Sequence, residues 1–127
     1  SYVHRQLYNA PYMDYSKFKD RYDQAKINMS MWSKPNWKMI HYFSSKYDGT
    51  AEYALSFKAF MSCMQFVLPC GKCREHLRNN LANHPIDEYF GSASDLFTWG
   101  YMLHQTVSSS IGKKGIPLAD AKRIHGL

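Results

Sequence analysis

Apolar residues along this chain recur at intervals of three and four positions, which is the spacing of one buried face of an α-helix. The clearest stripe has the spacing i, i+3, i+4 and i+7 and consists of Phe57, Phe60, Met61 and Met64. No segment alternates apolar and polar residues over the length that a central strand needs. The pattern therefore predicts an all-α protein.

Residues that start and stop helices divide most of the chain into four main helices and a short last one. The expected helices span residues 34–47, 50–67, 70–81, 94–111 and 117–125. We expect Pro35 in the first turn of the first helix, Thr50 at the cap of the second, and Gly112 just beyond the fourth. Helices joined by such short loops predict a compact bundle. Before them, residues 1–13 are rich in Tyr and predict an irregular arm, and residues 14–29 predict a polar helix.

The composition fits one folded domain and limits its partners. A chain of 127 residues is long enough for a single core. The net charge of +6 is scattered, with no basic run longer than two residues, which is typical of a solvated surface rather than of a nucleic-acid interface. No apolar stretch approaches the ~20 residues of a membrane span. We therefore expect a soluble domain with no nucleic-acid and no membrane partner.

The strongest chemical feature is the sequence Cys70-Gly71-Lys72-Cys73. Two cysteines three positions apart at the start of a helix lie on one side of it, close enough to form a disulfide. The helix N-terminus stabilises the thiolate of the leading cysteine, and Lys72 and Arg74 add positive charge. This pattern predicts a redox-active pair in which Cys70 is attacked and Cys73 leaves as the thiolate.

Other classes of cysteine site fit this sequence less well. A zinc site needs four ligands, and although His76 or His84 could join the two cysteines, no second CxxC exists. A c-type haem needs His where the chain has Arg74, and a thioredoxin-like reductase needs a strand before the motif, where the chain has helical spacing. We predict no metal, but a redox-silent zinc-binding interaction module and a flavin-free thiol exchanger stay open as alternatives.

Cys63, the third cysteine, lies seven positions before Cys70. Its position within an apolar helix favours a small buried hydrophobic side chain. A resolving or intermolecular thiol is the alternative.

The residues around the CxxC give it a wider context. Four motifs occur in a fixed order: Trp32-x4-Trp37-x3-His41, then Leu68-Pro69-Cys70-x2-Cys73-Arg74, then Phe97-x-Trp99-x4-His104, then Ile111-Gly112-Lys113. In this order and spacing they resemble the Erv/ALR family of flavin-linked sulfhydryl oxidases, over residues 32 to about 114. In its short length and its opening motif, the chain is similar to the compact members of this family that large DNA viruses encode. That similarity implies the host cytoplasm or the virion, with the mitochondrial intermembrane space or the endoplasmic reticulum as alternatives.

The resemblance implies a four-helix bundle with a short fifth helix, which binds FAD noncovalently and forms a homodimer. It implies a thiol oxidase that takes electrons from a dithiol-containing protein and passes them through FAD to oxygen, with release of hydrogen peroxide. Cys70 would exchange with the substrate, and Cys73 would face the flavin. Residues 1–31 have no counterpart in the family motifs, so we expect them to be an added extension of a domain that spans residues 32–127.

The resemblance also implies eight cofactor-binding residues, carried over by position: Lys34, Trp37, His41, Tyr47, Trp99, His104, Ser108 and Lys113. Trp37 and His41 would contact the isoalloxazine and its linker, and Tyr47 the ring. Trp99 and His104 would flank the adenine part, and Lys113 would reach the phosphates. The chain departs from the family pattern at Ser33, Gln105 and Ser108, where the family usually has Gly, Asn and Asn.

Overall fold

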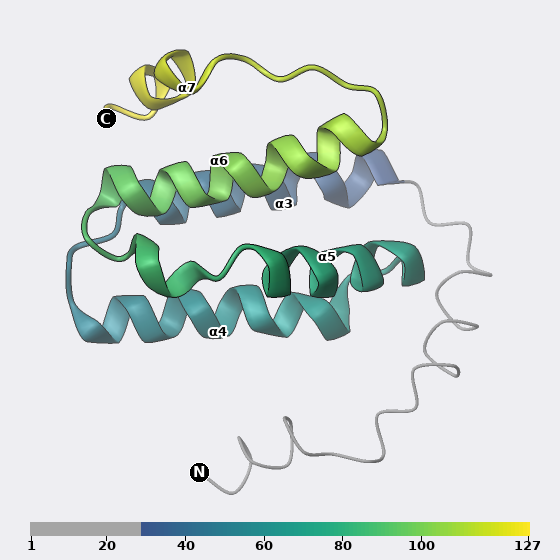
Figure 1. Ribbon diagram of the computed structural model, residues 1–127, viewed down its shortest axis with the longest axis horizontal. Helices are drawn as coiled ribbons and strands as arrows, with labels where there is room; N and C mark the ends of the chain where they lie inside the picture. Colours follow the sequence, from purple (N-terminus) through teal and green to yellow (C-terminus); the bar gives the residue numbers. More distant parts are fainter. Residues whose placement is uncertain (1–28) are drawn as a thin grey trace, which may run out of the picture.

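The computed structural model describes residues 29–127, and within this range it contains only helices (Figure 1). In chain order they are α3 (Met29–Ser45), α4 (Ala51–Val67), α5 (Gly71–Asn83), the short 3-10 helix η1 (Ile86–Tyr89), α6 (Ala93–Ser110) and α7 (Leu118–Ile124). No strand occurs in this range, which confirms the predicted all-α class. The arm and the polar helix predicted before residue 29 lie outside the described residues.

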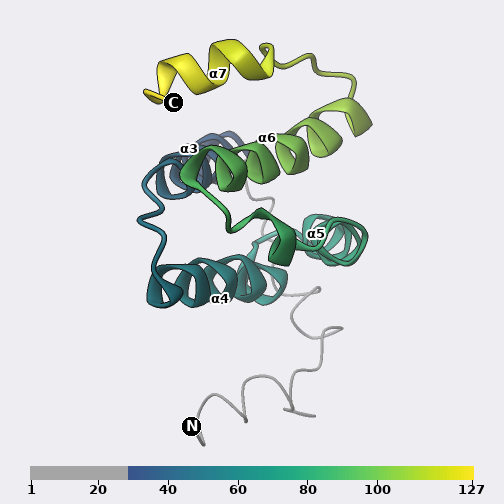
Figure 2. The ribbon, with the colours of Figure 1, turned by 60° about the vertical axis from the view of Figure 1, so that its left-hand side comes forward.

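The four long helices form a bundle of two packed pairs. Helix α3 lies along α6, and α4 lies along α5, with η1 packed on α6 (Figure 1). The short helix α7 contacts α6 on the side away from α4 and α5, as the turned view shows (Figure 2). The predicted bundle with a short fifth helix is therefore confirmed.

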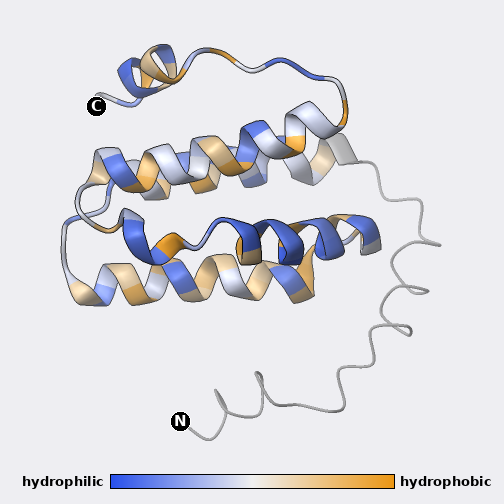
Figure 3. Cartoon of the chain, in the orientation of Figure 1, coloured by the Kyte–Doolittle hydropathy of each residue, from blue (hydrophilic) through white to orange (hydrophobic). Residues whose placement is uncertain are grey.

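The predicted apolar stripe forms part of the core. Phe57, Met61 and Met64 are buried, and Phe60 packs against them from the edge. They meet side chains from α3, α5, η1 and α6: Ile40, Leu77, Ile86, Leu96, Trp99 and Leu103. Helix α5 is mostly hydrophilic along its length, whereas α4 is more apolar (Figure 3). The face of α5 that meets the core is therefore narrow.

Local sequence sets where the helices begin and end. The Thr50 hydroxyl accepts a hydrogen bond from the Tyr53 amide at 3.1 Å, and the Ser92 hydroxyl accepts one from the Asp95 amide at the same distance. After α6, Gly112 takes the left-handed conformation that ends helices, with φ 74°. These positions agree with the predicted boundaries of both helices.

Helix α3 departs from the prediction, because it begins at Met29 and contains Pro35 in its interior. The expectation that Pro35 occupies the first turn was wrong. Proline removes one backbone donor from a helix, so the carbonyl of residue 31 loses its partner. Met31 and Pro35 are both exposed, so water can bond to that carbonyl. Among the described helices, none is both long and apolar enough to cross a bilayer.

Candidate active site

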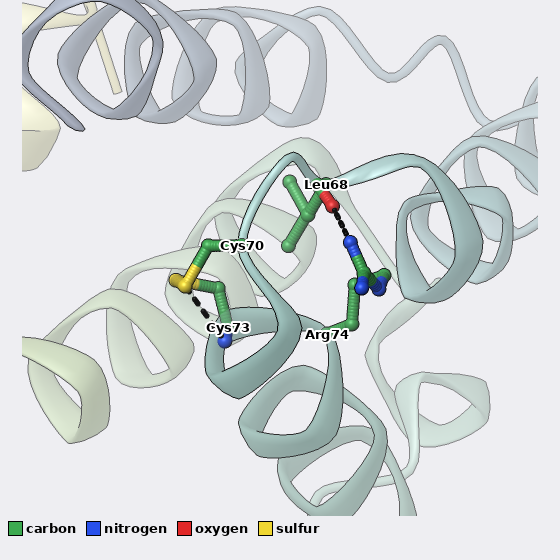
Figure 4. The surroundings of a disulfide bond; sticks show 4 residues. All are labelled: Leu68, Cys70, Cys73 and Arg74. Atoms are coloured by element: carbon green, nitrogen blue, oxygen red, sulfur yellow. Dashed lines mark hydrogen bonds between the residues drawn. A yellow bond between two sulfur atoms is a disulfide. The ribbon is translucent and has the colours of Figure 1, made fainter. Parts of the chain in front are cut away.

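The two cysteines of the CxxC form a disulfide at the start of α5 (Figure 4). Cys70 is the N-cap residue, and its Sγ accepts a hydrogen bond from the Cys73 amide at 3.2 Å. Their Cα atoms are 5.1 Å apart. This confirms that the two residues lie on one side of the helix, and it places the Cys70 sulfur at the positive end of the helix dipole.

Arg74 fixes the corner that leads into the CxxC. Its side chain is 2% exposed, and its guanidinium Nη1 donates to the Leu68 carbonyl at 2.5 Å. Figure 4 shows this contact on the opposite side of the turn from the disulfide. Arg74 therefore ties the end of α4 to the first turn of α5, a role that the sequence did not predict for this residue.

A cavity of about 350 Å³ lies between α3, α5 and the end of α6. Five of the eight predicted cofactor residues line it: Lys34, Trp37, His104, Ser108 and Lys113. Cys73 also lines it, whereas Cys70 does not. The two sulfur atoms of one disulfide thus meet different surroundings, since only Cys73 belongs to the cavity wall.

Two stacked rings form part of this wall. The centroids of the Trp37 and His104 rings are 4.2 Å apart and their planes differ by 11°. His41 lies behind them, outside the cavity wall, with its Nε2 2.8 Å from the His104 Nδ1. The predicted face of α3 that carries Trp37 and His41 is therefore present, but only Trp37 reaches the cavity.

Burial keeps both histidines neutral. It lowers the pKa of His41 from 6.5 to about 4, and the neighbouring His104 and His125 act in the same direction. Burial also lowers the pKa of His104. At neutral pH each ring therefore carries one hydrogen on one of its two nitrogens.

The low pKa of His41 makes stability depend on pH. Below pH 6.5 His41 binds a proton in the unfolded chain, whereas in the folded chain it binds one only near pH 4. The free energy of unfolding is therefore highest above pH 6.5. It decreases as the pH falls toward 4, by at most about 3 kcal/mol. We expect urea unfolding to show this loss between pH 7 and about pH 4.5.

The His41→Gln variant is the control for this loss, because carboxyl groups also begin to titrate in the same range. The variant should lose less stability than the natural chain over the same pH interval. Equal losses in the two proteins would show that His41 does not cause the effect.

Two predicted cofactor residues, Tyr47 and Trp99, lie away from the cavity. The Tyr47 hydroxyl donates to the Phe90 carbonyl at 3.0 Å. Trp99 is 1% exposed, and its Nε1 donates to the His84 carbonyl at 2.9 Å. The structure gives both residues a packing role, and it gives no support to their predicted contact with a cofactor.

The cavity also contains residues that were not predicted as site residues, including Trp32, Asn36, His76 and Lys114. Trp32 has a buried Nε1 with no hydrogen-bond partner among the described residues. A signal for two of them was present in the sequence, since Trp32 opens the first motif and Lys114 follows Lys113. His76 lies one helical turn after Cys73, which also could have indicated it.

Cys63 is exposed, so the expectation of a buried side chain was wrong. Each residue turns the helix by about 100°, which places position 63 about 200° from Met61 and so on the outer side of α4. Within the described part of the chain, no group of three or more His, Cys, Asp or Glu side chains could hold a metal ion. The zinc alternative therefore has no support.

The fold and the site together define a class: a helical bundle with a CxxC disulfide at a helix start beside a cavity. Stacked rings line the cavity, and Lys34, Lys113 and Lys114 bring positive charge to it.

Comparison with known proteins gives the family within this class. Residues 34–125 match the family described as Erv1 / Alr, and the chain belongs to that family. It is 31% identical to a probable FAD-linked sulfhydryl oxidase of Acanthamoeba polyphaga mimivirus over 98 residues, which cover 75% of this chain and 68% of the relative. It is 26% identical to an FAD-linked sulfhydryl oxidase of Arabidopsis thaliana over 86 residues, which cover 66% of this chain and 44% of that relative. The chain thus spans less than half the length of the plant protein.

Proposed function

We propose that this chain is an FAD-linked sulfhydryl oxidase that forms disulfide bonds in dithiol-containing proteins and passes the electrons to molecular oxygen. The main observation that supports this proposal is the position of Cys73. It is one half of the disulfide and also part of the cavity wall, so one residue joins the thiol chemistry to the cofactor site. Membership of the Erv1 / Alr family supports the same function.

The residues of the cavity fit FAD. Trp37 and His104 offer flat surfaces to a planar ring, and Lys34 and Lys113 would bind the phosphates. The Trp32 Nε1 is a buried donor without a partner in the described part of the chain, and a ligand rich in carbonyl and phosphate oxygens can satisfy it. Ser108 adds a hydroxyl to the wall. We propose these residues as the cofactor site, with His41 acting from behind His104.

The cysteine pair performs thiol–disulfide exchange in two steps. A substrate thiolate attacks the Cys70 sulfur, the bond between Cys70 and Cys73 breaks, and Cys73 leaves as a thiolate. A second substrate thiolate then attacks the substrate sulfur of the mixed disulfide, and Cys70 leaves in turn. The substrate has lost two electrons, which the cysteine pair has gained, and two protons, which the substrate thiols release to solvent when they ionise. When bound, FAD would supply the acceptor for this electron pair, and molecular oxygen would take the pair together with two protons from solvent to give hydrogen peroxide.

The start of α5 favours these steps. The helix N-terminus stabilises a thiolate at Cys70, so this residue is a good leaving group in the second step. Cys70 lies outside the cavity wall, which leaves it for the substrate, whereas Cys73 faces the cofactor site. We infer this division of roles for the two cysteines.

We also propose that the enzyme acts as a homodimer, with residues 1–31 as an extension of a domain over residues 32–127. Large apolar side chains on the outer surfaces of α3 and α4 support a partner surface: Met39 is 44% exposed, Tyr42 54% and Leu55 69%. The family match begins at residue 34, which supports the proposed domain boundary.

A visible absorption spectrum tests the function directly. The purified chain should show a flavin band that bleaches when dithiothreitol is added and recovers in air while an electrode records oxygen uptake. A colourless protein that binds no added FAD and has unreactive thiols would favour the interaction module. Thiol exchange that survives complete flavin removal would favour the flavin-free exchanger.

A further inference from the structure

The hydrogen bond between His41 and His104 can form in two ways, which differ in the ring that donates the hydrogen. The His41 Nε2 and the His104 Nδ1 are 2.8 Å apart, so one nitrogen carries the hydrogen and the other accepts it. Trp37 stacks on the His104 ring at 4.2 Å and holds its plane. Because both rings are neutral, fixing the hydrogen on one ring also fixes it on the other.

The second nitrogen of His41 decides which arrangement is favoured. The His41 Nδ1 is buried and has no hydrogen-bond partner among the described residues. It lies near the backbone of α6 at Gly100, 3.9 Å from the position that a Cβ atom on this glycine would occupy. The nearby Ser44 hydroxyl donates its hydrogen to the His41 carbonyl at 3.0 Å and forms no hydrogen bond with the His41 ring. Within residues 29–127, no side chain or backbone group therefore accepts a hydrogen from the His41 Nδ1.

An unpaired donor and an unpaired acceptor differ in how well a protein tolerates them. Buried N–H groups without an acceptor are rarer in native structures than acceptors that lack a donor. His41 is therefore more stable with its hydrogen on Nε2, where it donates to the His104 Nδ1. The hydrogen of His104 then lies on its Nε2, at the other side of a ring that lines the cavity.

We infer that His41 is a positioning residue, which holds His104 in the tautomer that presents an Nε2–H donor to the cavity. This part of the wall therefore selects a hydrogen-bond acceptor on the bound molecule. The inference rests on the proposed function only in taking that molecule to be FAD. It gives His41 a role through its neighbour rather than through direct contact with the ligand.

The tautomers can be observed directly in the full chain with its flavin bound. Long-range nitrogen–proton NMR on protein labelled with ¹⁵N-histidine separates protonated from bare ring nitrogens. We expect a bare Nδ1 and a protonated Nε2 in both His41 and His104. A hydrogen on the His41 Nδ1, or a bare His104 Nε2, would overturn the inference.

Substitution of His41 separates positioning from packing. His41→Leu removes the donor, so His104 should populate both tautomers, and FAD should bind about tenfold more weakly. His41→Gln supplies an amide donor, which should restore the Nε2–H tautomer of His104 and most of the affinity. A Leu variant with the same His104 tautomer as the natural chain would contradict the positioning role, and so would a Gln variant that behaves like the Leu variant.

His125→Leu is the matched control, because the His125 ring packs 6.3 Å from the His41 ring and no hydrogen bond joins the two. This variant should leave the His104 tautomer unchanged. A chain that bound no FAD would contradict the proposed function. The His41 and His104 tautomers could then still be measured in the ligand-free chain, and they would test the positioning role separately.

Discussion

The Cys73→Ser variant should lose thiol oxidation by a factor on the order of a thousand or more and still bind FAD. Serine is close in size to cysteine but forms no disulfide, so Cys70 has no partner to displace when a substrate attacks. The cavity wall loses only one sulfur atom, and the stacked Trp37 and His104 rings stay in place. Oxygen uptake with dithiothreitol measures the activity, and the flavin absorption of the purified variant measures the bound cofactor.

Cys63→Ser is the matched control for this experiment. Cys63 is exposed on α4 and takes no part in the disulfide, so its variant should retain full activity and full flavin content. The Cys70→Ser variant should lose oxidation of protein thiols, as Cys73→Ser does, because the residue that receives the substrate is gone. Full turnover by Cys73→Ser would contradict the assignment of the CxxC as the redox centre.

The fold could be predicted from sequence because its signals are local. The spacing of Phe57, Met61 and Met64 determines the buried side of α4. The Thr50 side chain caps the N-terminus of α4 and so sets where this helix begins. The start of α3 was placed too late because Pro35 is usually a residue of the first helical turn. Its exposed position lets water bond to the carbonyl that loses its donor, and exposure depends on packing that no local pattern contains.

The candidate site was predicted in part. The CxxC is a local motif, so its disulfide and its place at a helix start follow from spacing. Trp37 and Trp99 look equally suited to a cofactor in the sequence, yet Trp37 lines the cavity and Trp99 donates to the His84 carbonyl inside the core. The contact between His41 and His104 joins residues 63 positions apart. It exists only because α3 packs along α6, and so it could not be read from either motif alone.

The Arg74→Met variant should destabilise the oxidised chain by about 2 kcal/mol. Met keeps most of the apolar stem of this buried side chain but has no donor for the Leu68 carbonyl, which Arg74 contacts at 2.5 Å. A hydrogen bond from a charged donor contributes more to stability than an average hydrogen bond does. Urea unfolding under oxidising conditions measures the change, and the rate at which dithiothreitol reduces the disulfide shows whether the corner at Cys70 has loosened.

Lys72→Met is the control that matches Arg74→Met, since it removes the same charge from the same helical turn. Lys72 is exposed, so its loss should change stability by less than about 0.5 kcal/mol. The comparison separates the contact with the Leu68 carbonyl from the general effect of removing positive charge beside the cysteines. If both variants unfolded at the same urea concentration, Arg74 would contribute charge alone, and the position of the CxxC would depend on the backbone of the corner rather than on the guanidinium that spans it.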